Sequence, residues 1–153
     1  MAQKKGTLLL YNSVLHPHPQ TLPCVNILVV NDTAPSIVYM DVINNGLDKA
    51  RVLRQSSQFD VATCGEAADV NLDGELEVAI GTSGQAVIVY KWNEQADEWL
   101  LQFMRRMDDP VHAIRSVDLT GDGLQELVVQ TTKVKSLTIY FMKALHWLIS
   151  LIL

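Results

Sequence analysis

Two stretches of the chain decide the fold, and they read DVNLDGELEVAI at residues 69–80 and DLTGDGLQELVV at residues 118–129. They align without gaps at an offset of 49 residues (118 − 69), with identical residues at the first, fifth, sixth and ninth positions. Asp, Asn and Gly at these spacings are typical of a tight turn, and the apolar run that follows is typical of a buried strand. The chain therefore uses one unit, an acidic turn followed by a strand, twice.

The sequence between the two turns has the periodicity of β-strands. Apolar residues alternate along 76–80, a turn follows at 82–85, and 86–90 is a continuous apolar run typical of a strand buried on both faces. Further along, Trp99, Leu101 and Phe103 alternate with their neighbours, which predicts a half-solvated strand with these three side chains on one face. Four strands in a repeat of about 50 residues are typical of a β-propeller blade.

The composition limits what the chain can be. Its 153 residues are 48% apolar and 19% charged, which suits one compact domain with a hydrophobic core. The net charge of −5 excludes nucleic-acid binding driven by bulk charge, so no nucleic-acid partner is expected. Cys24 and Cys64 are too few for a disulfide framework or a four-ligand zinc site. We therefore expect free thiols in a reducing, cytoplasmic compartment.

We predict an all-β fold, a partial β-propeller of two to three four-stranded blades. A chain of 153 residues has room for about three repeats of 49 (153 / 49), whereas closed propellers use about four to eight blades. We therefore expect an open arc whose terminal sheets need further sheets beside them, in a longer protein or through assembly. The predicted organisation is a leader or linker at 1–24, an incomplete propeller at 25–136 with blades at about 25–58, 59–108 and 109–136, and an apolar tail at 137–153.

The apolar tail permits more than one interpretation. It carries Lys143 and His146, and its 17 residues (137 to 153) are at the short limit for a membrane span. A helical tail anchor is one interpretation, and an outer strand followed by an amphipathic helix, or an aberrant end to a truncated chain, are the others. We favour a tail that does not insert, so that any membrane contact would be indirect.

The two acidic turns are the candidate metal sites. Calcium takes six to eight oxygen ligands, and a Gly at the sixth position permits the sharp bend that such a loop needs. The alternative is a self-capped turn, in which the Asp carboxylates accept hydrogen bonds from backbone N–H groups, the Gly takes φ > 0 and the Glu faces solvent at the start of the strand. We favour the self-capped turn, because binding calcium at low concentration requires a more highly charged and rigid site. The candidate ligands are Asp69, Asn71, Asp73 and Glu77 in the first turn and Asp118, Thr120, Asp122 and Glu126 in the second.

The acidic turns and several neighbouring segments resemble known propeller repeats. The turns are similar to the FG-GAP-type repeats of integrin α-subunits. The run at 117–127, with the segments at 45–47, 57–60 and 69–74, resembles the C-terminal part of the kaptin family over roughly residues 29–134. The N-terminal blades of that family have no counterpart here, and the apolar ending after Lys135 replaces the charged ending that the resemblance leads us to expect.

The kaptin resemblance implies a subunit of the KICSTOR complex, with roles in amino-acid sensing at the lysosomal surface and in negative regulation of TOR kinase signalling. It also implies association with actin filaments in lamellipodia and stereocilia. The sequence contains no catalytic motif, so we expect a non-enzymatic scaffold with KICSTOR subunits and actin filaments as partners, no catalytic residues and no cofactor. The alternatives are a calcium-binding, integrin-like adhesion propeller and a tail-anchored membrane protein.

Overall fold

The computed structural model describes residues 6–13, 24–133, 136–143 and 146–152, with side chains described for residues 24–132, and these residues form three four-stranded sheets. Sheet 1 contains β1 (Gly6–Ser13), β2 (Cys24–Asn31), β3 (Ile37–Tyr39) and β4 (Ala50–Val52). Sheet 2 contains β5 (Ala62–Ala68), β6 (Glu77–Thr82), β7 (Ala86–Asn93) and β8 (Glu98–Arg106). Sheet 3 contains β9 (Val111–Val117), β10 (Glu126–Lys133), β11 (Ser136–Lys143) and β12 (His146–Ile152). A short helix, α1 (Val42–Asn45), follows β3, and a 3-10 helix, η1 (Ser56–Phe59), precedes β5.

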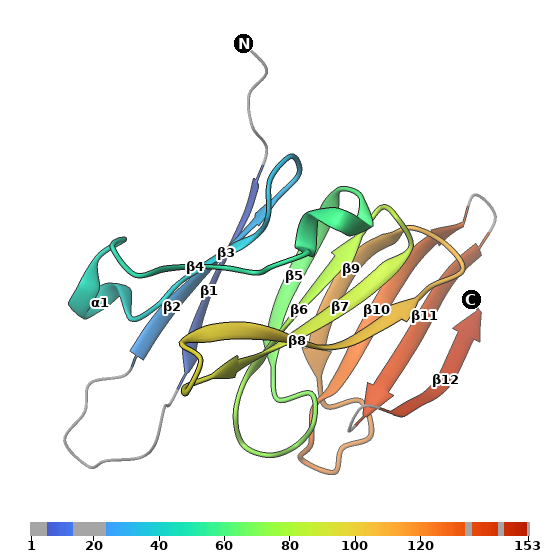
Figure 1. Ribbon diagram of the computed structural model, residues 1–153. Coiled ribbons are helices and arrows are strands. Elements are labelled where there is room, and N and C mark those ends of the chain that lie inside the picture. The colour runs from blue at the N-terminus through green and yellow to red at the C-terminus, as the bar shows by residue number, and fades with distance from the viewer. Residues whose placement is uncertain (1–5, 14–23, 134–135, 144–145, 153) are drawn as a thin grey trace.

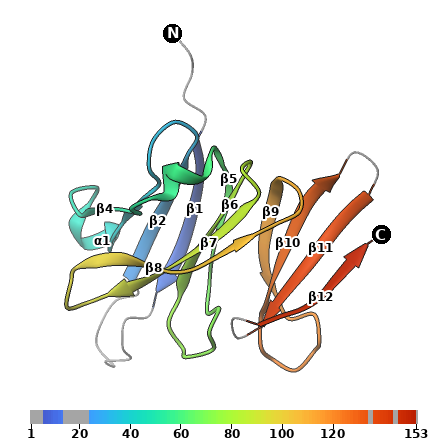
Figure 2. The ribbon, with the colours of Figure 1, turned by 45° about the vertical axis from the view of Figure 1, so that its right-hand side comes forward.

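Each sheet is an antiparallel meander whose strands pair in their order along the chain. Figures 1 and 2 show the three sheets side by side, with sheet 2 in the middle. The first strands of neighbouring sheets contact each other, β1 with β5 and β5 with β9, as the innermost strands of adjacent propeller blades do. The prediction of an all-β, partial β-propeller is confirmed.

Two hydrophobic cores lie on the two sides of sheet 2, one against sheet 1 and the other against sheet 3. Successive side chains of β6 and β7 enter alternate cores, because neighbouring residues of a strand point to opposite faces. Val78 and Ile88 belong to the first core, whereas Ala79 and Val89 belong to the second. All five residues of 86–90 are fully buried, which confirms the prediction that this run is covered on both faces.

Two glycines let the sheets approach closely near the inner strands. A Cβ atom at Gly65 would lie 2.8 Å from side-chain carbons of both Leu28 and Val30 in sheet 1. A Cβ atom at Gly81 would collide with Val111 of sheet 3 and lie 2.7 Å from the sulfur of Cys64. Any larger side chain at these positions would push neighbouring sheets apart, so both glycines are required by packing.

A bulge in β8 changes one prediction from the sequence. The pairing with β7 shifts register between Val89 and Tyr90, so that Tyr90 faces Leu101 while Val89 faces Phe103. A one-residue shift moves every following side chain to the opposite face of a strand. Trp99 consequently packs in the first core and Phe103 against the second, rather than on one shared face.

The structure also differs from the prediction at both ends of the chain. Strand β1 lies within the predicted leader or linker at 1–24 and pairs along its whole length with β2; residues 1–5 and 14–23 lie outside the described residues. Strands β11 and β12 occupy most of the tail at 137–153, in place of a helix, and complete sheet 3. Tertiary pairing with β10 decides this, because apolar runs of seven or eight residues suit a strand as well as a helix. Across the described ranges, no helix has the length and apolar character needed to cross a membrane.

Candidate functional site

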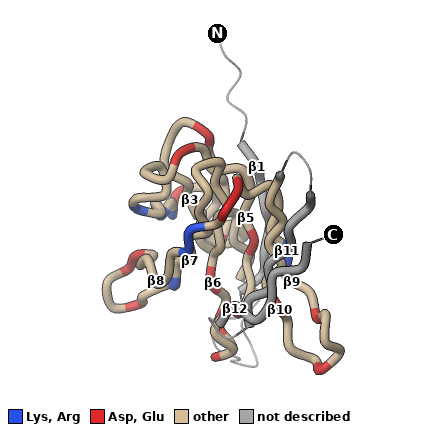
Figure 3. The backbone as a smooth tube through the Cα atoms, turned by 90° about the vertical axis from the view of Figure 1, so that its right-hand side faces the viewer, with Lys and Arg blue, Asp and Glu red and all other residues tan. Residues whose placement is uncertain are grey.

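The two acidic turns occupy the same place in successive sheets. Turn 1 (residues 69–77) joins β5 to β6, and turn 2 (residues 118–126) joins β9 to β10. Figure 1 shows both loops at the same end of their sheets, and Figure 3 shows that acidic positions lie mainly on the loops that connect strands. The repeat found in the sequence is therefore a structural repeat, with one acidic turn between the first two strands of sheet 2 and one between the first two strands of sheet 3.

Turn 1 is held by carboxylate and amide oxygens that accept hydrogen bonds from its own backbone. The Asp69 carboxylate accepts from the N–H groups of Asp73 (3.0 Å) and Gly74 (2.8 Å). Asn71 Oδ1 accepts from Asp73 N–H at 2.9 Å, and Asp73 Oδ1 accepts from Glu75 N–H at 3.0 Å. These are the hydrogen bonds of a self-capped turn.

Turn 2 repeats the pattern. Its first carboxylate, Asp118, accepts from the N–H groups of Gly121 (2.7 Å) and Gly123 (2.8 Å), and Asp122 Oδ1 accepts from Leu124 N–H at 3.0 Å. The first and fifth positions of the repeat thus have the same role in both turns. Identical residues at these positions reflect a shared backbone geometry.

The ninth position closes each turn from inside the protein. Glu77 and Glu126 begin strands β6 and β10, and each is only 2% exposed, so the prediction that these glutamates face solvent is wrong. Glu77 Oε2 accepts from Val70 N–H and Glu126 Oε2 from Leu119 N–H, both at 2.8 Å. A buried carboxylate that satisfies a backbone donor fixes where the chain leaves the turn, since losing the acceptor would leave that N–H unpaired.

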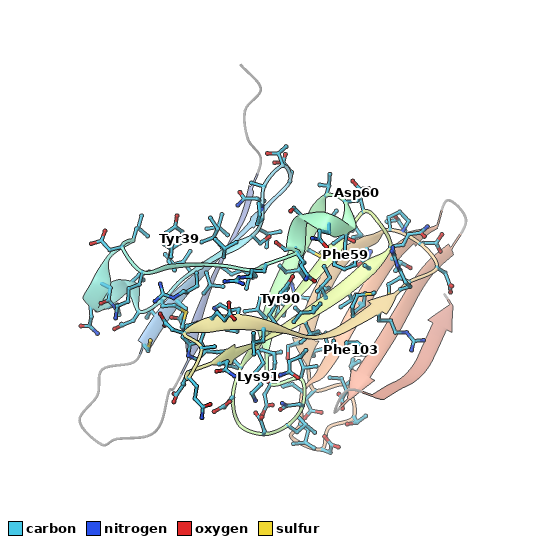
Figure 4. All side chains as sticks on the ribbon, in the orientation of Figure 1. Tyr39, Phe59, Asp60, Tyr90, Lys91 and Phe103 are labelled. Atoms are coloured by element: carbon cyan, nitrogen blue, oxygen red, sulfur yellow. The ribbon has the colours of Figure 1, made fainter. Side chains whose placement is uncertain are left out.

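Lys91 is the cationic partner of the carboxylates of turn 1. Its ammonium group forms an ion pair with Asp73 and lies 3.0 Å from Glu75 Oε2 and 3.2 Å from Glu77 Oε1. Its side chain is 19% exposed, and Figure 4 shows it on β7 beside the loop of turn 1. In turn 2 the hydroxyl of Thr120 donates instead to Glu126 Oε1, at 3.1 Å. The second oxygen of the buried glutamate therefore meets a cation in turn 1 and a hydroxyl in turn 2.

The charges in turn 1 shift one another's pKa values. Burial alone would raise the pKa of Asp73, but hydrogen bonds from Lys91, Glu75 N–H and Asn71 lower it overall. Burial alone would lower the pKa of Lys91, but its three carboxylate partners raise it above the ordinary value. Burial raises the pKa of Glu77, opposed by the Val70 N–H and by Lys91. The ammonium is thus held charged at neutral pH.

Lys91 was not predicted as a site residue from the sequence, although the register of the β6–β7 hairpin contains the signal. Pairing of Val78 with Tyr90 places the next residue of β7, Lys91, opposite Glu77. In sheet 3, Leu127 pairs with Met142, so the next register position places Lys143 opposite Glu126. A turn at 82–85 was predicted, and counting outward from it would have found Lys91.

Several of the oxygen atoms that a calcium ion would need in turn 1 already have other partners. Both oxygens of Asp69 already accept backbone hydrogen bonds, and the Lys91 ammonium sits among Asp73, Glu75 and Glu77. Among the residues described, no group of three or more His, Cys, Asp or Glu side chains is arranged to hold a metal ion. Calcium binding stays a prediction, to be tested by titrating calcium and following the shift in Tm.

The fold and the turns define the class of protein as an incomplete β-propeller with an acidic turn repeated in two successive blades. The family model described as "KICSTOR complex protein kaptin" matches residues 5–145. The Mus musculus protein of the same description is 42% identical over 111 residues, which cover 71% of this chain and 26% of the mouse protein. The chain belongs to the kaptin family, and it spans about a quarter of the length of that relative.

Proposed function

We propose that the chain is a non-enzymatic scaffold that acts within the KICSTOR complex. In this role it takes part in amino-acid sensing and in negative regulation of TOR kinase signalling, at the lysosomal surface and in the cytoplasm. The proposal includes association with actin filaments in lamellipodia and stereocilia. Its partners are proteins, and its contact with membranes is indirect.

The observation that carries this proposal is the family match over residues 5–145, whose description places its members in a complex. The fold is compatible with such a role, because propeller blades present rigid loops and outer strands to partners. The outer strand β8 exposes Leu101 (40%) and Met104 (39%) on one face and Leu100 (36%) on the other. Exposed apolar residues on a rigid strand suit protein contacts better than catalysis.

Affinity purification of the tagged full chain from cells tests the KICSTOR role. We expect KICSTOR subunits to co-purify and the chain to be enriched on lysosomes. The matched control is Ile88→Lys, which places a charge in the first core and should lose all specific partners with the fold. Recovery of the same proteins with Ile88→Lys, or of none with the unaltered chain, would contradict the proposal.

Actin association is tested separately, by co-sedimentation of the purified chain with actin filaments. We expect the chain to pellet with filaments in proportion to their concentration. A double variant, Leu101→Ser with Met104→Ser, tests whether β8 contributes, because both side chains lie on the same face, are exposed, and can be lost without disturbing the core. If the chain stays in the supernatant at every filament concentration, the actin part of the proposal is wrong and the KICSTOR part is unaffected.

A further inference from the structure

The outer face of sheet 1 is apolar and has no described sheet packed against it. Leu28, Val30 and Val38 of this sheet are buried in the first core, so the alternate residues of β2 and β3 point to the other face. These are Ile27, Val29, Ile37 and Tyr39, all only partly buried. We call these four residues the outer face. Val52 of β4 pairs with Ile37 and is 49% exposed beside them.

The outer face matches a face of sheet 2 residue for residue. Ile27 pairs with Tyr39 just as Val78 pairs with Tyr90, an offset of 51 residues in both strands (78 − 27 and 90 − 39). Pairing of Val29 with Ile37 likewise corresponds to pairing of Ile80 with Ile88. The two sheets thus present the same pattern of two β-branched residues on the second strand, and Ile and Tyr on the third.

The matching face of sheet 2 shows what this pattern does. Val78, Ile80, Ile88 and Tyr90 are each fully buried in the core against sheet 1. The Tyr90 hydroxyl donates a hydrogen bond of 2.8 Å to the backbone carbonyl of Arg54, which follows β4 in the preceding sheet. Burial raises the pKa of Tyr90 to about 12, as expected for a phenol enclosed between two sheets. This tyrosine therefore joins its sheet to the chain segment that leaves the preceding sheet.

Tyr39 has the same place in sheet 1 but a different environment. No residue described in the structure accepts a hydrogen bond from its hydroxyl. Figure 4 shows Tyr90 between sheets 1 and 2 and Tyr39 on sheet 1, well away from that core. Tyrosine has an apolar ring and a polar hydroxyl. At the end of an apolar face, Tyr39 is therefore suited to a contact in which its ring packs against apolar side chains and its hydroxyl donates a hydrogen bond.

The face of sheet 2 that packs against sheet 3 shows what kind of surface covers a face like the outer face. Ala68 and Val70 of sheet 2, each 4% exposed, are covered by sheet 3. Their counterparts 49 residues later, Val117 and Leu119, are 40% and 50% exposed. Neighbouring sheets thus pack a face of the kind formed by Ala68 and Val70 against a face of the kind that carries Tyr90 in sheet 2 and Tyr39 in sheet 1.

We propose that the outer face docks a further four-stranded antiparallel sheet of the same construction, as the blade that precedes sheet 1. Its small and β-branched side chains cover Ile27, Val29 and Ile37, and a backbone carbonyl after its fourth strand accepts from the Tyr39 hydroxyl. The contact continues the interface between sheets 1 and 2 by one repeat. Its source is the 74% of the mouse relative (100 − 26) that this chain does not span. The proposal is independent of the KICSTOR role.

The decisive experiment compares the chain alone with a chimera in which it replaces the matched region of the mouse protein. Hydroxyl-radical footprinting with mass spectrometry reports the solvent exposure of individual side chains. We expect Tyr39 to be labelled in the chain alone and protected to the level of Tyr90 in the chimera. Ile43, on α1 and 57% exposed, should be labelled in both. Equal labelling of Tyr39 in the two proteins, with Tyr90 protected in both, would overturn the proposal.

Two substitutions in the full chain keep the proposal testable if the chimera fails to fold. Ile37→Lys and Ile43→Lys make the same change on and off the outer face, and Ile88→Lys makes it in the covered face. We expect Ile37→Lys to lower the Tm of the chain no more than Ile43→Lys does, and to reduce binding of an apolar dye more. An Ile37→Lys chain that unfolds like Ile88→Lys would show that the face is already covered, and would overturn the proposal.

Self-association of the chain is the other way in which the outer face could be covered. A second copy could offer its own Val117 and Leu119 to the outer face. Light scattering of the chain alone would then give twice its mass of 17.0 kDa, with Tyr39 protected as concentration rises. That result would overturn a distinct preceding blade as the occupant. A monomer with exposed Tyr39 at all concentrations supports it.

Discussion

Turn 1 and turn 2 share their backbone hydrogen bonds but differ in what surrounds them. In both, the first Asp caps the loop and the buried glutamate accepts from an N–H seven residues earlier. Lys91 reaches turn 1 from β7, whereas Thr120 serves turn 2 from within the loop. The local motif therefore sets the shape of the turn, while the partner of the buried glutamate differs: a neighbouring strand supplies it in turn 1, and the third position of the loop supplies it in turn 2.

The two turns also differ in how far a neighbouring sheet buries them. Val70, at the second position of turn 1, is 4% exposed because it packs in the core against sheet 3. Leu119, its counterpart in turn 2, is 50% exposed. Loss of a polar partner is more costly where water cannot replace it, so equal substitutions in the two turns should have unequal effects.

The largest difference is expected from removing the buried glutamates. Glu77→Ala leaves Val70 N–H without an acceptor in a dry environment and removes one partner of Lys91, and we expect a loss of about 2–3 kcal/mol of unfolding free energy. Glu126→Ala exposes Leu119 N–H near solvent and should cost about 1 kcal/mol. Urea denaturation measures both. Equal losses would contradict the expectation that burial and Lys91 make the glutamate of turn 1 the more costly to remove.

Replacing the cation should have an intermediate effect. Lys91→Met keeps most of the side-chain volume but leaves Asp73, Glu75 and Glu77 close together without a positive charge, and should cost about 1–2 kcal/mol. Lys49→Met, at an exposed position, is the matched control and should change little. If both variants have the same Tm, the ion pairs of turn 1 contribute no stability.

Raising the pH tests the ion pairs of Lys91 without a mutation, because it removes the positive charge of the ammonium group. The folded pKa of Lys91 is raised above the ordinary value of 10.5, so its contribution is present below pH 10.5 and is lost as pH rises through the folded pKa. Above about pH 10.5 the Tm should therefore fall less steeply in Lys91→Met than in the unaltered chain, whereas below that pH the two slopes should match. Parallel Tm curves for the two proteins would contradict this assignment.

The smallest effect is expected at the fourth position, where the two turns carry different residues in the same backbone conformation. Leu72 has φ +64° and Gly121 has φ +71°, a region that disfavours side chains with a Cβ. Gly121→Leu should cost about 1 kcal/mol, and Leu72→Gly should gain about 0.5 kcal/mol at most. Thermal unfolding of both variants measures this. A stabilising Gly121→Leu would mean that the turns do not share their backbone geometry.

Strand patterns predicted the middle of the fold best. Buried runs such as 86–90, and the turns on either side of them, depend on side-chain period and local turn chemistry, which a sequence displays directly. The bulge in β8 and the strands at the two ends were missed, because pairing with a neighbouring strand decides them. Lys91 was missed for the same reason, since it lies 14 residues from Glu77 (91 − 77) along the chain.

The sequence by itself determined the repeat, the acidic turns and the all-β class, since each of these depends on contacts between residues only a few positions apart. Only the tertiary structure decided which faces are covered, where Lys91 lies, and that Tyr90 meets a carbonyl after the last strand of the preceding sheet, whereas Tyr39 meets none among the described residues. These features depend on residues that are distant in the chain, and packing between whole sheets brings such residues together.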